Sequence, residues 1–176
     1  MKKVLIISSS PRRGGNSEML CREFERGAKQ AGHEVEFIRL AEKKVNYCIG
    51  CYACSRTGVC FHHDDMREIA TKVAECDVLV LATPVYFYSM SGQLKVFIDR
   101  LVPTYTKVKA DVYLFATAYD SNTKNLESTI EAIRGCTRDC METTEKGVIM
   151  VGGVDEAGDI HGRKELQTAF EMGKNC

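Results

Sequence analysis

Uninterrupted apolar runs alternate along the chain with segments whose apolar residues recur every three or four positions. Such runs are typical of strands buried on both faces of a sheet, and the spacing of three and four is typical of a helix with one apolar face. The runs predict buried strands at 3–9, 77–83, 111–118 and 147–151, and a weaker alternation predicts a strand near a sheet edge at 33–40. Helical spacing occurs between them, at 16–31, 65–73, 91–101, 126–133 and 166–170.

The order of these elements indicates a fold class. Strand and helix alternate along the whole chain, so we expect right-handed crossovers and a parallel sheet with helices on both faces. This is an α/β protein of three layers. In such sheets, ligands bind beyond the carboxyl ends of the strands, beside the point where the strand order reverses. Three segments, 8–17, 83–90 and 117–122, would converge there.

The composition narrows the class of protein. A chain of 176 residues with 44% hydrophobic and 27% charged residues can fold as one domain with a substantial core. Its formal net charge of +0 gives no reason to expect nucleic acid or an anionic membrane as partner. No apolar run is long enough for a signal peptide or a membrane span, so we expect a cytoplasmic protein. Disulfides are rare in that compartment, and the nine cysteines are therefore interpreted first as metal-binding or catalytic.

The segment "SSSPRRGGNSEML", residues 8–20, leaves a predicted buried strand and enters a helix. Backbone N–H groups, the positive end of the helix, several hydroxyls and two arginines come together there and form an anion site. Neither the Walker signature nor the GxGxxG fingerprint is present, which disfavours ATP and a dinucleotide site of the Rossmann type. A phosphate monoester remains as the ligand. The alternative is a serine-rich turn with a good helix cap.

The segment "TPVYFYSM", residues 83–90, places three aromatic residues in a row at the carboxyl edge of the sheet. These aromatic side chains are costly to leave in water, and a flat tricyclic ligand would cover them. The alternative is that they pack against another subunit. No Ser-His-Asp triad and no pair of carboxylates accompanies these loops.

The two loops together carry a resemblance to a known family. "SPRRGGNS" and "PVYFYSMSGQLKVFIDR" resemble the phosphate loop and the second loop of flavodoxin-like NAD(P)H-dependent FMN reductases. The resemblance implies a flavodoxin-like sandwich with a five-stranded parallel sheet in the order 2-1-3-4-5 and FMN at its carboxyl edge. For the FMN phosphate it implies Ser9, Ser10, Arg12, Asn16 and Ser17. For the isoalloxazine it implies Pro84, Val85, Tyr86 and Phe87, with Thr117, Ala118 and Tyr119 from a third loop that departs from the family's T-x-G pattern.

Four of the cysteines lie in "CIGCYACSRTGVC", with the spacing C-x2-C-x2-C-x5-C. Cysteines at three-residue steps wrap a cubane cluster in bacterial ferredoxins, whereas structural zinc more often takes two separated pairs. The segment is similar to the compact motif of archaeal and bacterial iron–sulfur flavoproteins, which implies a [4Fe–4S] cluster held by Cys48, Cys51, Cys54 and Cys60. A disulfide, free thiols, or zinc with His62 or His63 remain as alternatives. We expect a single domain, residues 1–176, with a cysteine-rich insertion at about 43–63.

The resemblance implies an FMN-dependent oxidoreductase in which the flavin carries the chemistry, so no catalytic side chain is expected. Electrons would come from NAD(P)H or a ferredoxin-type donor and pass to a small acceptor or an electron carrier, through the cluster where one is bound. The second hypothesis is a one-electron carrier like flavodoxin, which the neutral charge disfavours because flavodoxins are strongly acidic. A third is a flavin-free scaffold. The family also implies a homodimer or homotetramer, and Lys95, Asp99 and Arg100 are interpreted as a structural ion-pair network.

Overall fold

The structure is a computed structural model that describes residues 1–176. Its centre is a parallel sheet in the order β2-β1-β3-β5-β6, to which a two-residue strand is added at the end of β3. In chain order the strands are β1 (Lys3–Ser8), β2 (Glu34–Arg39), β3 (Val78–Tyr86), β4 (Ser89–Met90), β5 (Lys109–Thr117) and β6 (Glu142–Val151). The predicted fold class is confirmed. The predicted strand order 2-1-3-4-5 is confirmed as well: the sequence analysis did not predict the short antiparallel β4, so the predicted fourth and fifth strands are β5 and β6.

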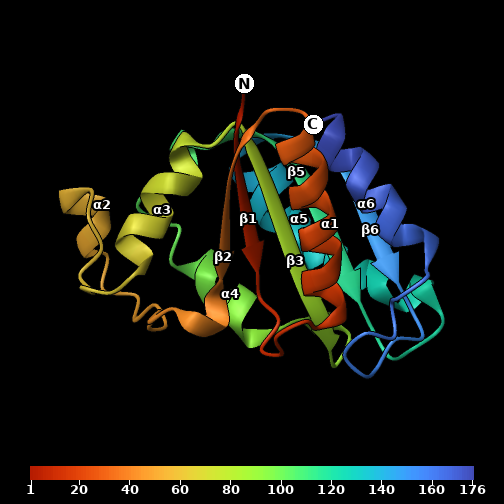
Figure 1. Cartoon of the computed structure of the whole chain (residues 1–176). Coiled ribbons are helices and arrows are strands. Elements are labelled where there is room, and N and C mark those ends of the chain that lie inside the picture. Colours follow the sequence, from red (N-terminus) through yellow and green to blue (C-terminus); the bar gives the residue numbers. More distant parts are fainter.

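Helices cover both faces of the sheet, as the alternation of strand and helix predicts (Figure 1). One face carries α1 (Asn16–Gln30) and α6 (Lys164–Lys174), and the other carries α3 (Met66–Glu75), α4 (Gly92–Asp99) and α5 (Glu127–Cys140). Short helices complete the chain: η1 (Leu40–Glu42), α2 (Ala53–Thr57), η2 (Tyr105–Lys107) and η3 (Thr123–Leu126).

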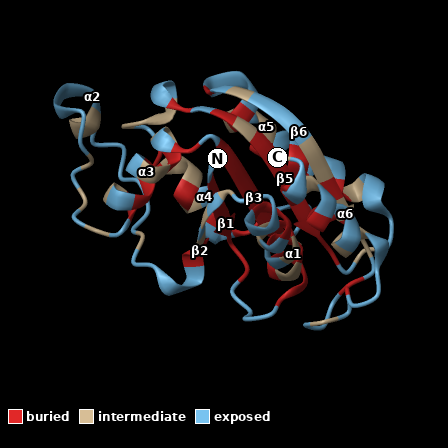
Figure 2. Cartoon of the chain, turned by 45° about the horizontal axis from the view of Figure 1, so that its top comes forward, coloured by how far each residue is buried: buried red, intermediate tan, exposed pale blue.

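The strand β1 shows why the core has two halves. Val4 and Ile6 pack in the cluster under α1 and α6, whereas Leu5 and Ile7 pack in the cluster under α3, α4 and α5. Successive side chains of a strand point to opposite faces, so a strand covered on both faces must be apolar at every position. Figure 2 shows these buried strands at the centre of the molecule, with α2 and its flanking loops exposed at one end.

The last strand begins earlier than the hydrophobic pattern indicates. The apolar run predicts a strand at 147–151, but β6 starts at Glu142, and its first five residues, "ETTEK", are mostly exposed. These residues pair with the start of β5, and a shift of register between Val112 and Tyr113 leaves Lys146 without a partner. The strand lies at the edge of the sheet, where charged residues are favoured because they oppose pairing with another chain. The predicted start of this strand was therefore wrong.

Two glycines allow α1 and α6 to lie in direct contact. A β-carbon on Gly27 would lie 2.0 Å from the carbonyl oxygen of Phe170, and one on Gly173 would lie 2.0 Å from that of Phe24. Real side chains do not tolerate such distances, so the two helices pack backbone to backbone at these positions.

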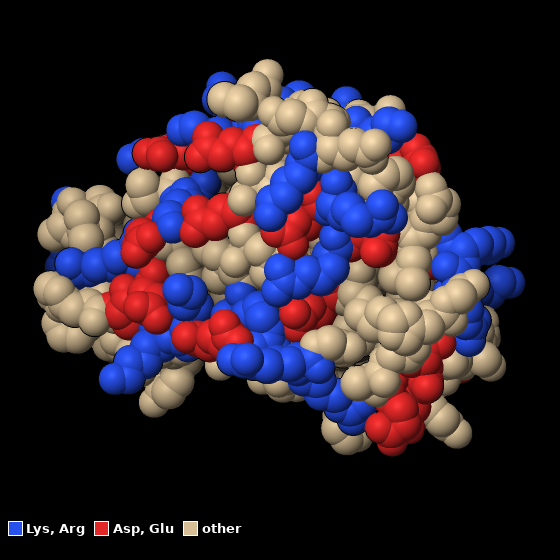
Figure 3. Space-filling model, viewed as in Figure 1, with Lys and Arg blue, Asp and Glu red and all other residues tan.

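The surface carries charges of both signs. On the face that Figure 3 shows, Lys and Arg side chains are interspersed with Asp and Glu. Several ion pairs of the chain lie within one helix, such as Arg26 with Glu23 and Lys29 with Glu25 on α1. No helix of the chain combines the length and the apolar character that crossing a membrane requires.

Candidate functional site

An open cleft lies at the carboxyl ends of β1, β3, β5 and β6, where the three predicted loops meet. It has a volume of about 180 Å³ and is lined by Ser10, Arg12, Gly15, Asn16, Ser17, Pro84, Val85, Tyr86, Thr117, Ala118, Tyr119, Val154, Asp155 and Ala157. All the cofactor residues expected in the three loops line this cleft except Ser9 and Phe87. A fourth segment, 154–157, lines it as well, and the sequence analysis did not consider it.

The first turn of α1 reaches the cleft without a side-chain cap, because its N-cap residue is Gly15. A β-carbon on Gly15 would lie 2.5 Å from the Oγ of Ser10, so another residue there would require the Ser10 side chain to move. Ser17 in the same turn is buried, and its Oγ has no hydrogen-bond partner. An anion of the size of phosphate can bind here. It would accept hydrogen bonds from the uncapped N–H groups at the positive end of the helix, from the free hydroxyl of Ser17 and from the guanidinium of Arg12.

Asn16 lines the cleft, but its amide is occupied by other contacts. The Nδ2 donates to the carbonyl oxygen of Glu156 at 2.9 Å. The Oδ1 accepts from the backbone N–H groups of Gly158 and Ile160, both at 3.2 Å. The side chain therefore joins the first loop to the segment after β6. Its contact with the FMN phosphate stays a prediction.

Ser9 lies outside the cleft and is fully buried. Its Oγ donates to the carbonyl oxygen of Ala82 and accepts from the Oγ of Ser91, each at 2.9 Å. Ser91 is the N-cap of α4, and its backbone N–H donates to the Oγ1 of Thr83 at 2.9 Å. Ser9 thus ties the first loop to the second loop and to α4.

The second loop is a tight hairpin whose tip consists of two aromatic residues. Val85 pairs with Met90 and Tyr86 with Ser89, so Phe87 and Tyr88 form a two-residue turn. Both have positive φ, 49° and 58°, as the usual hairpin turn requires, although glycine and asparagine are the residues that favour it. The left-handed conformation costs roughly 1–2 kcal/mol for each such residue. Tyr86 lines the cleft, whereas Phe87 is fully exposed and does not contribute to it.

The third loop is held in place by the segment that follows β6. The backbone N–H of Gly153 donates to the carbonyl oxygen of Asp120 at 3.1 Å, and that of Val154 donates to Ala118 at 3.0 Å. Gly152 allows this approach, because a β-carbon there would lie 2.5 Å from the oxygen of Asp120. The pair Gly152-Gly153, directly after the predicted strand at 147–151, was the sequence signal for a fourth loop at this edge.

The cysteine segment starts and ends at a base held by hydrogen bonds. The backbone N–H of Lys44 donates to a carboxylate oxygen of Asp65 at 2.7 Å, and the N–H of Asp65 donates to the carbonyl oxygen of Lys44 at 3.1 Å. Arg67 on α3 donates from Nη2 to the carbonyl oxygen of Cys60 at 2.7 Å. Between these points the chain projects away from the sheet, and no residue of α2 is buried (Figure 1).

A buried ion pair fastens this base to α4. Arg100 donates from Nη1 and Nη2 to the two carboxylate oxygens of Asp64, each at 2.8 Å, and the two side chains are only 1% and 3% exposed. Burial alone would raise the pKa of the Asp64 carboxyl, but hydrogen bonds from Arg100 and Asn46 outweigh it and hold the pKa well below its usual range. Arg100 is therefore structural, as expected, but its partner is Asp64; Lys95 and Asp99 pair separately at 2.5 Å.

The four cysteines of the motif are accessible thiols. Cys48 and Cys51 are exposed, Cys54 and Cys60 are half-buried, and none of the nine cysteines forms a disulfide. The structure contains no group of three or more Cys, His, Asp or Glu side chains arranged to hold a metal ion. The thiols that a cluster needs are present in one short segment, but the segment does not gather them around a common point.

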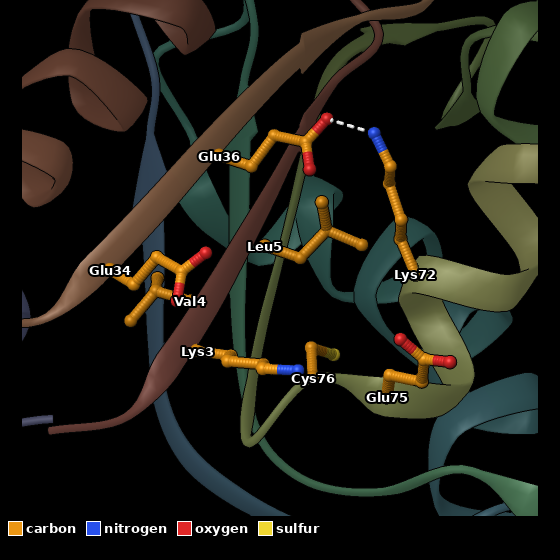
Figure 4. A pocket seen from close by; sticks show the side chains of 8 residues that line it. All are labelled: Lys3, Val4, Leu5, Glu34, Glu36, Lys72, Glu75 and Cys76. Atoms are coloured by element: carbon orange, nitrogen blue, oxygen red, sulfur yellow. Dashed lines mark hydrogen bonds and ion pairs between the residues drawn. The ribbon is translucent and has the colours of Figure 1, made fainter.

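A second pocket lies at the opposite, amino end of the sheet, between α3 and the first strands (Figure 4). It is lined by Lys3, Val4, Leu5, Glu34, Glu36, Lys72, Glu75 and Cys76, and Lys72 pairs with Glu36 across it at 2.5 Å. Burial raises the pKa of the Cys76 thiol to about 12, which makes it a poor nucleophile. None of the predicted loops reaches this pocket, so we do not assign it to the candidate site.

Comparisons with known proteins identify the family of the chain. The sequence model of the family described as NADPH-dependent FMN reductase matches residues 2–133. An iron–sulfur flavoprotein of Methanocaldococcus jannaschii is 46% identical over 101 residues, which is 57% of this chain and 52% of that protein. An iron–sulfur flavoprotein of Methanosarcina thermophila is 32% identical over 161 residues, 90% of this chain and 81% of that protein. This chain therefore spans about half the length of the first relative and most of the second.

A solved structure supports the fold. The NAD(P)H:quinone oxidoreductase from Methanothermobacter marburgensis superimposes with a TM-score of 0.74, covering 99% of this chain and 96% of that one. The two sequences are 19% identical, so this likeness concerns the fold alone.

Proposed function

The chain belongs to the NADPH-dependent FMN reductase family, of the type that includes iron–sulfur flavoproteins, and from this premise we propose that it is an FMN-dependent oxidoreductase. The observation that carries the proposal is the cleft at the carboxyl edge of the sheet. It combines an anion site at the start of α1 with aromatic side chains at its mouth, and FMN has a phosphate at one end and a flat ring system at the other.

The phosphate end of the cleft fits FMN in its polar groups. The N–H groups at the start of α1 have no side-chain cap, and the Oγ of Ser17 has no hydrogen-bond partner. The guanidinium of Arg12 donates to the carbonyl oxygen of Asp155 but is paired with no carboxylate, so its positive charge is not neutralised. A phosphate dianion accepts from several donors at once, and charged hydrogen bonds are about twice as strong as neutral ones. The loop thus has the composition and the shape that a phosphate monoester needs.

The ring end of the cleft fits an isoalloxazine that stays partly uncovered. Pro84, Val85 and Tyr86 form one wall, and Thr117, Ala118 and Tyr119 form the other. A cleft of about 180 Å³ is below the 300–1,000 Å³ typical of sites that enclose a ligand. We propose that one face of the ring stays open to a nicotinamide, because hydride transfer requires the two rings to be in contact.

FMN, when bound, accepts a hydride from a nicotinamide and releases electrons singly or in pairs. The chain then needs only to bind and orient the two partners. Thr83, Ser91 and Ser9 form a buried hydrogen-bond network beneath the second loop, which fixes the hairpin that carries Tyr86. NADH, NADPH or a ferredoxin-type protein as donor, and a small molecule or an electron carrier as acceptor, are all compatible with this arrangement.

We also propose that the cysteine segment carries a [4Fe–4S] cluster on Cys48, Cys51, Cys54 and Cys60. The donor set fits, because four thiolates within thirteen residues match the ligand chemistry of such clusters. Cluster binding would require the cysteines to move toward one another. The projecting part of the segment has no buried helix to disrupt, and its base stays fixed by Asp64 and Arg100.

The exposed hairpin supports an assembly of several copies. Phe87 and Tyr88 adopt strained backbone conformations at the tip of a hairpin whose carbonyl oxygen at Tyr88 accepts from the Oγ of Ser128 at 2.7 Å. Strain held by the surrounding structure is common at functional positions. We propose a homodimer or homotetramer in which this tip is covered by another copy beside the open face of the cleft.

Anaerobic purification tests the proposal. The protein should bind FMN, and rapid mixing with NADPH or NADH should bleach the flavin absorbance at about 450 nm. If neither nucleotide bleaches it while dithionite does, the chain is a one-electron carrier or depends on a ferredoxin-type donor. Iron and acid-labile sulfide assays, with electron paramagnetic resonance of the reduced protein and a Cys51→Ser variant beside it, test the cluster. Bound FMN without iron or sulfide after anaerobic reconstitution would reject the cluster and leave the reductase intact.

A further inference from the structure

We propose that Asn16 is a positioning residue that fastens the segment 153–160 across the phosphate end of the cleft, and that this wall makes the site select FMN over FAD. The inference rests on the proposed function and deepens it by naming the class of flavin. FMN ends in a phosphate monoester, whereas FAD continues into a second phosphate and adenosine. The wall segment, defined as residues 153–160, lies outside residues 2–133 that match the family, so membership of the family says nothing about it.

The wall segment is joined to the first loop by two side chains. Asn16 makes three hydrogen bonds to its backbone, to the carbonyl of Glu156 and from the N–H groups of Gly158 and Ile160. Arg12 donates from Nη1 to the carbonyl oxygen of Asp155 at 2.5 Å. The Asn16 amide both donates to and accepts from the same stretch of backbone, so it fixes the position and the orientation of the wall segment.

The wall segment is joined to the third loop by its backbone. The N–H groups of Gly153 and Val154 donate to Asp120 and Ala118. The segment therefore spans the cleft from the third loop to the first, and Val154, Asp155 and Ala157 face the space between them. Val154 and Ile160 are buried and anchor its two ends in the core under α1 and α6.

The turn inside the wall segment is also held from within. A carboxylate oxygen of Asp159 accepts from the N–H groups of Asp155 at 3.0 Å and Glu156 at 2.9 Å. These hydrogen bonds lower the pKa of the Asp159 carboxyl, so the contact is present at neutral pH. Asp159 does not line the cleft, which makes it a second fastening point that touches no ligand.

The wall segment blocks the path beyond a phosphate bound at the start of α1. A flavin that ends at this phosphate fits within the cleft. A flavin with a second phosphate would have to pass Asp155 and Ala157, which line the cleft, and Asp155 is acidic. Steric exclusion and like-charge repulsion against the wrong ligand are common means of selectivity.

The test compares the dissociation constants of FMN, FAD and riboflavin for the wild type, Asn16→Ala, Asp159→Ala and, as a control, Asn175→Ala at the far end of α6. Wild type and the control should bind FMN at least about tenfold more tightly than FAD. Both wall variants should lower this preference about tenfold, because either substitution removes two or more of the hydrogen bonds that hold the wall. If Asn16 instead binds the phosphate, Asp159→Ala will behave like wild type, and the proposal is overturned.

Hydrogen–deuterium exchange separates this inference from the proposed function. Asn16→Ala should increase exchange of residues 153–160 and leave that of β1 and β3 unchanged, with or without flavin. Unchanged exchange in the wall segment would reject the positioning role. A wild type that binds no flavin would reject the proposed function, while the exchange result would still show whether Asn16 fastens the segment.

Discussion

Asp64→Asn removes the carboxylate partner of a buried guanidinium. Asp64 receives two hydrogen bonds of 2.8 Å from Arg100, and it also accepts from the backbone and the side chain of Asn46 at 2.9 and 3.1 Å. Asparagine keeps the size but loses the charge, and its NH₂ group cannot accept from Arg100. Removing one partner of a buried ion pair costs about 3–5 kcal/mol, because the other charge stays buried and uncompensated.

Urea unfolding, followed by circular dichroism, measures this loss. Asp99→Asn is the matched control, since Asp99 pairs with Lys95 on the exposed side of α4, where such a pair contributes about 0.3–0.5 kcal/mol. The double substitution Asp64→Leu, Arg100→Met should recover most of the loss, because no charge then remains buried. A free energy of unfolding for Asp64→Asn within about 1 kcal/mol of the control would refute the interpretation of a buried, fully paired carboxylate.

The same pair predicts a dependence on pH. The pKa of Asp64 in the folded protein lies below that of an unfolded aspartate, about 3.9, so the unfolded state binds the proton more tightly. The contribution of the pair to stability is therefore fully present above about pH 5 and is lost as the pH falls below 4. Asp64→Asn should reduce the slope of unfolding free energy against pH in that range. An unchanged slope would contradict the low pKa.

Three further predictions concern packing, backbone strain and thiol reactivity. Gly27→Ala should lower the free energy of unfolding by about 1–3 kcal/mol, because the new methyl group would collide with the backbone of α6. The control Gly135→Ala on α5 has open space around the methyl group and should raise the free energy of unfolding by about 0.5–1 kcal/mol. Equal effects of the two substitutions in thermal denaturation would count against the close contact. Phe87→Gly should raise the free energy of unfolding of the monomer by about 1 kcal/mol, because glycine adopts a positive φ without strain. Phe87→Ala should give no such increase, because alanine is strained at the same φ. An increase in both variants would show that exposure of the Phe87 side chain, and not backbone strain, is the cause. Iodoacetamide at pH 8 should label the exposed Cys48 and Cys51 of iron-free protein within minutes. Cys21 and Cys76 should stay unlabelled, because burial raises the pKa of both thiols. Rapid labelling of Cys76 in peptide mass maps would contradict its burial.

The central strands and their order could be predicted because they obey one dominant rule. A strand covered on both faces has to be apolar where it is covered, and the central residues of β1, β3 and β5 satisfy this. The first half of β6 escaped prediction because an edge strand faces solvent and can be polar. The three loops followed from the strands, since all parallel strands end at the same edge of the sheet.

The contacts within the site could not be predicted from the pattern. Asn16 and Glu156 are 140 residues apart, and nothing in the local sequence of either indicates the other. In the same way, Arg100 was expected to pair on its own helix, yet its partner is Asp64, 36 residues away. Side-chain hydrogen bonds of this kind depend on the packed fold, whereas strands and helices depend on the periodicity of one segment.

The most direct test of the account is the affinity of the apo-protein for FMN in the wild type, Arg12→Ala and Arg13→Ala. Arg12 lines the cleft, whereas Arg13 is 82% exposed, pairs with Glu42 and lies outside it. Arg12→Ala should weaken FMN binding by about 1.5–3 kcal/mol, roughly 10- to 150-fold, and should leave riboflavin binding unchanged, because only FMN has the phosphate. Arg13→Ala should match wild type for both ligands. Equal FMN affinity in all three proteins, measured by quenching of flavin fluorescence, would contradict the assignment of this cleft as the FMN site.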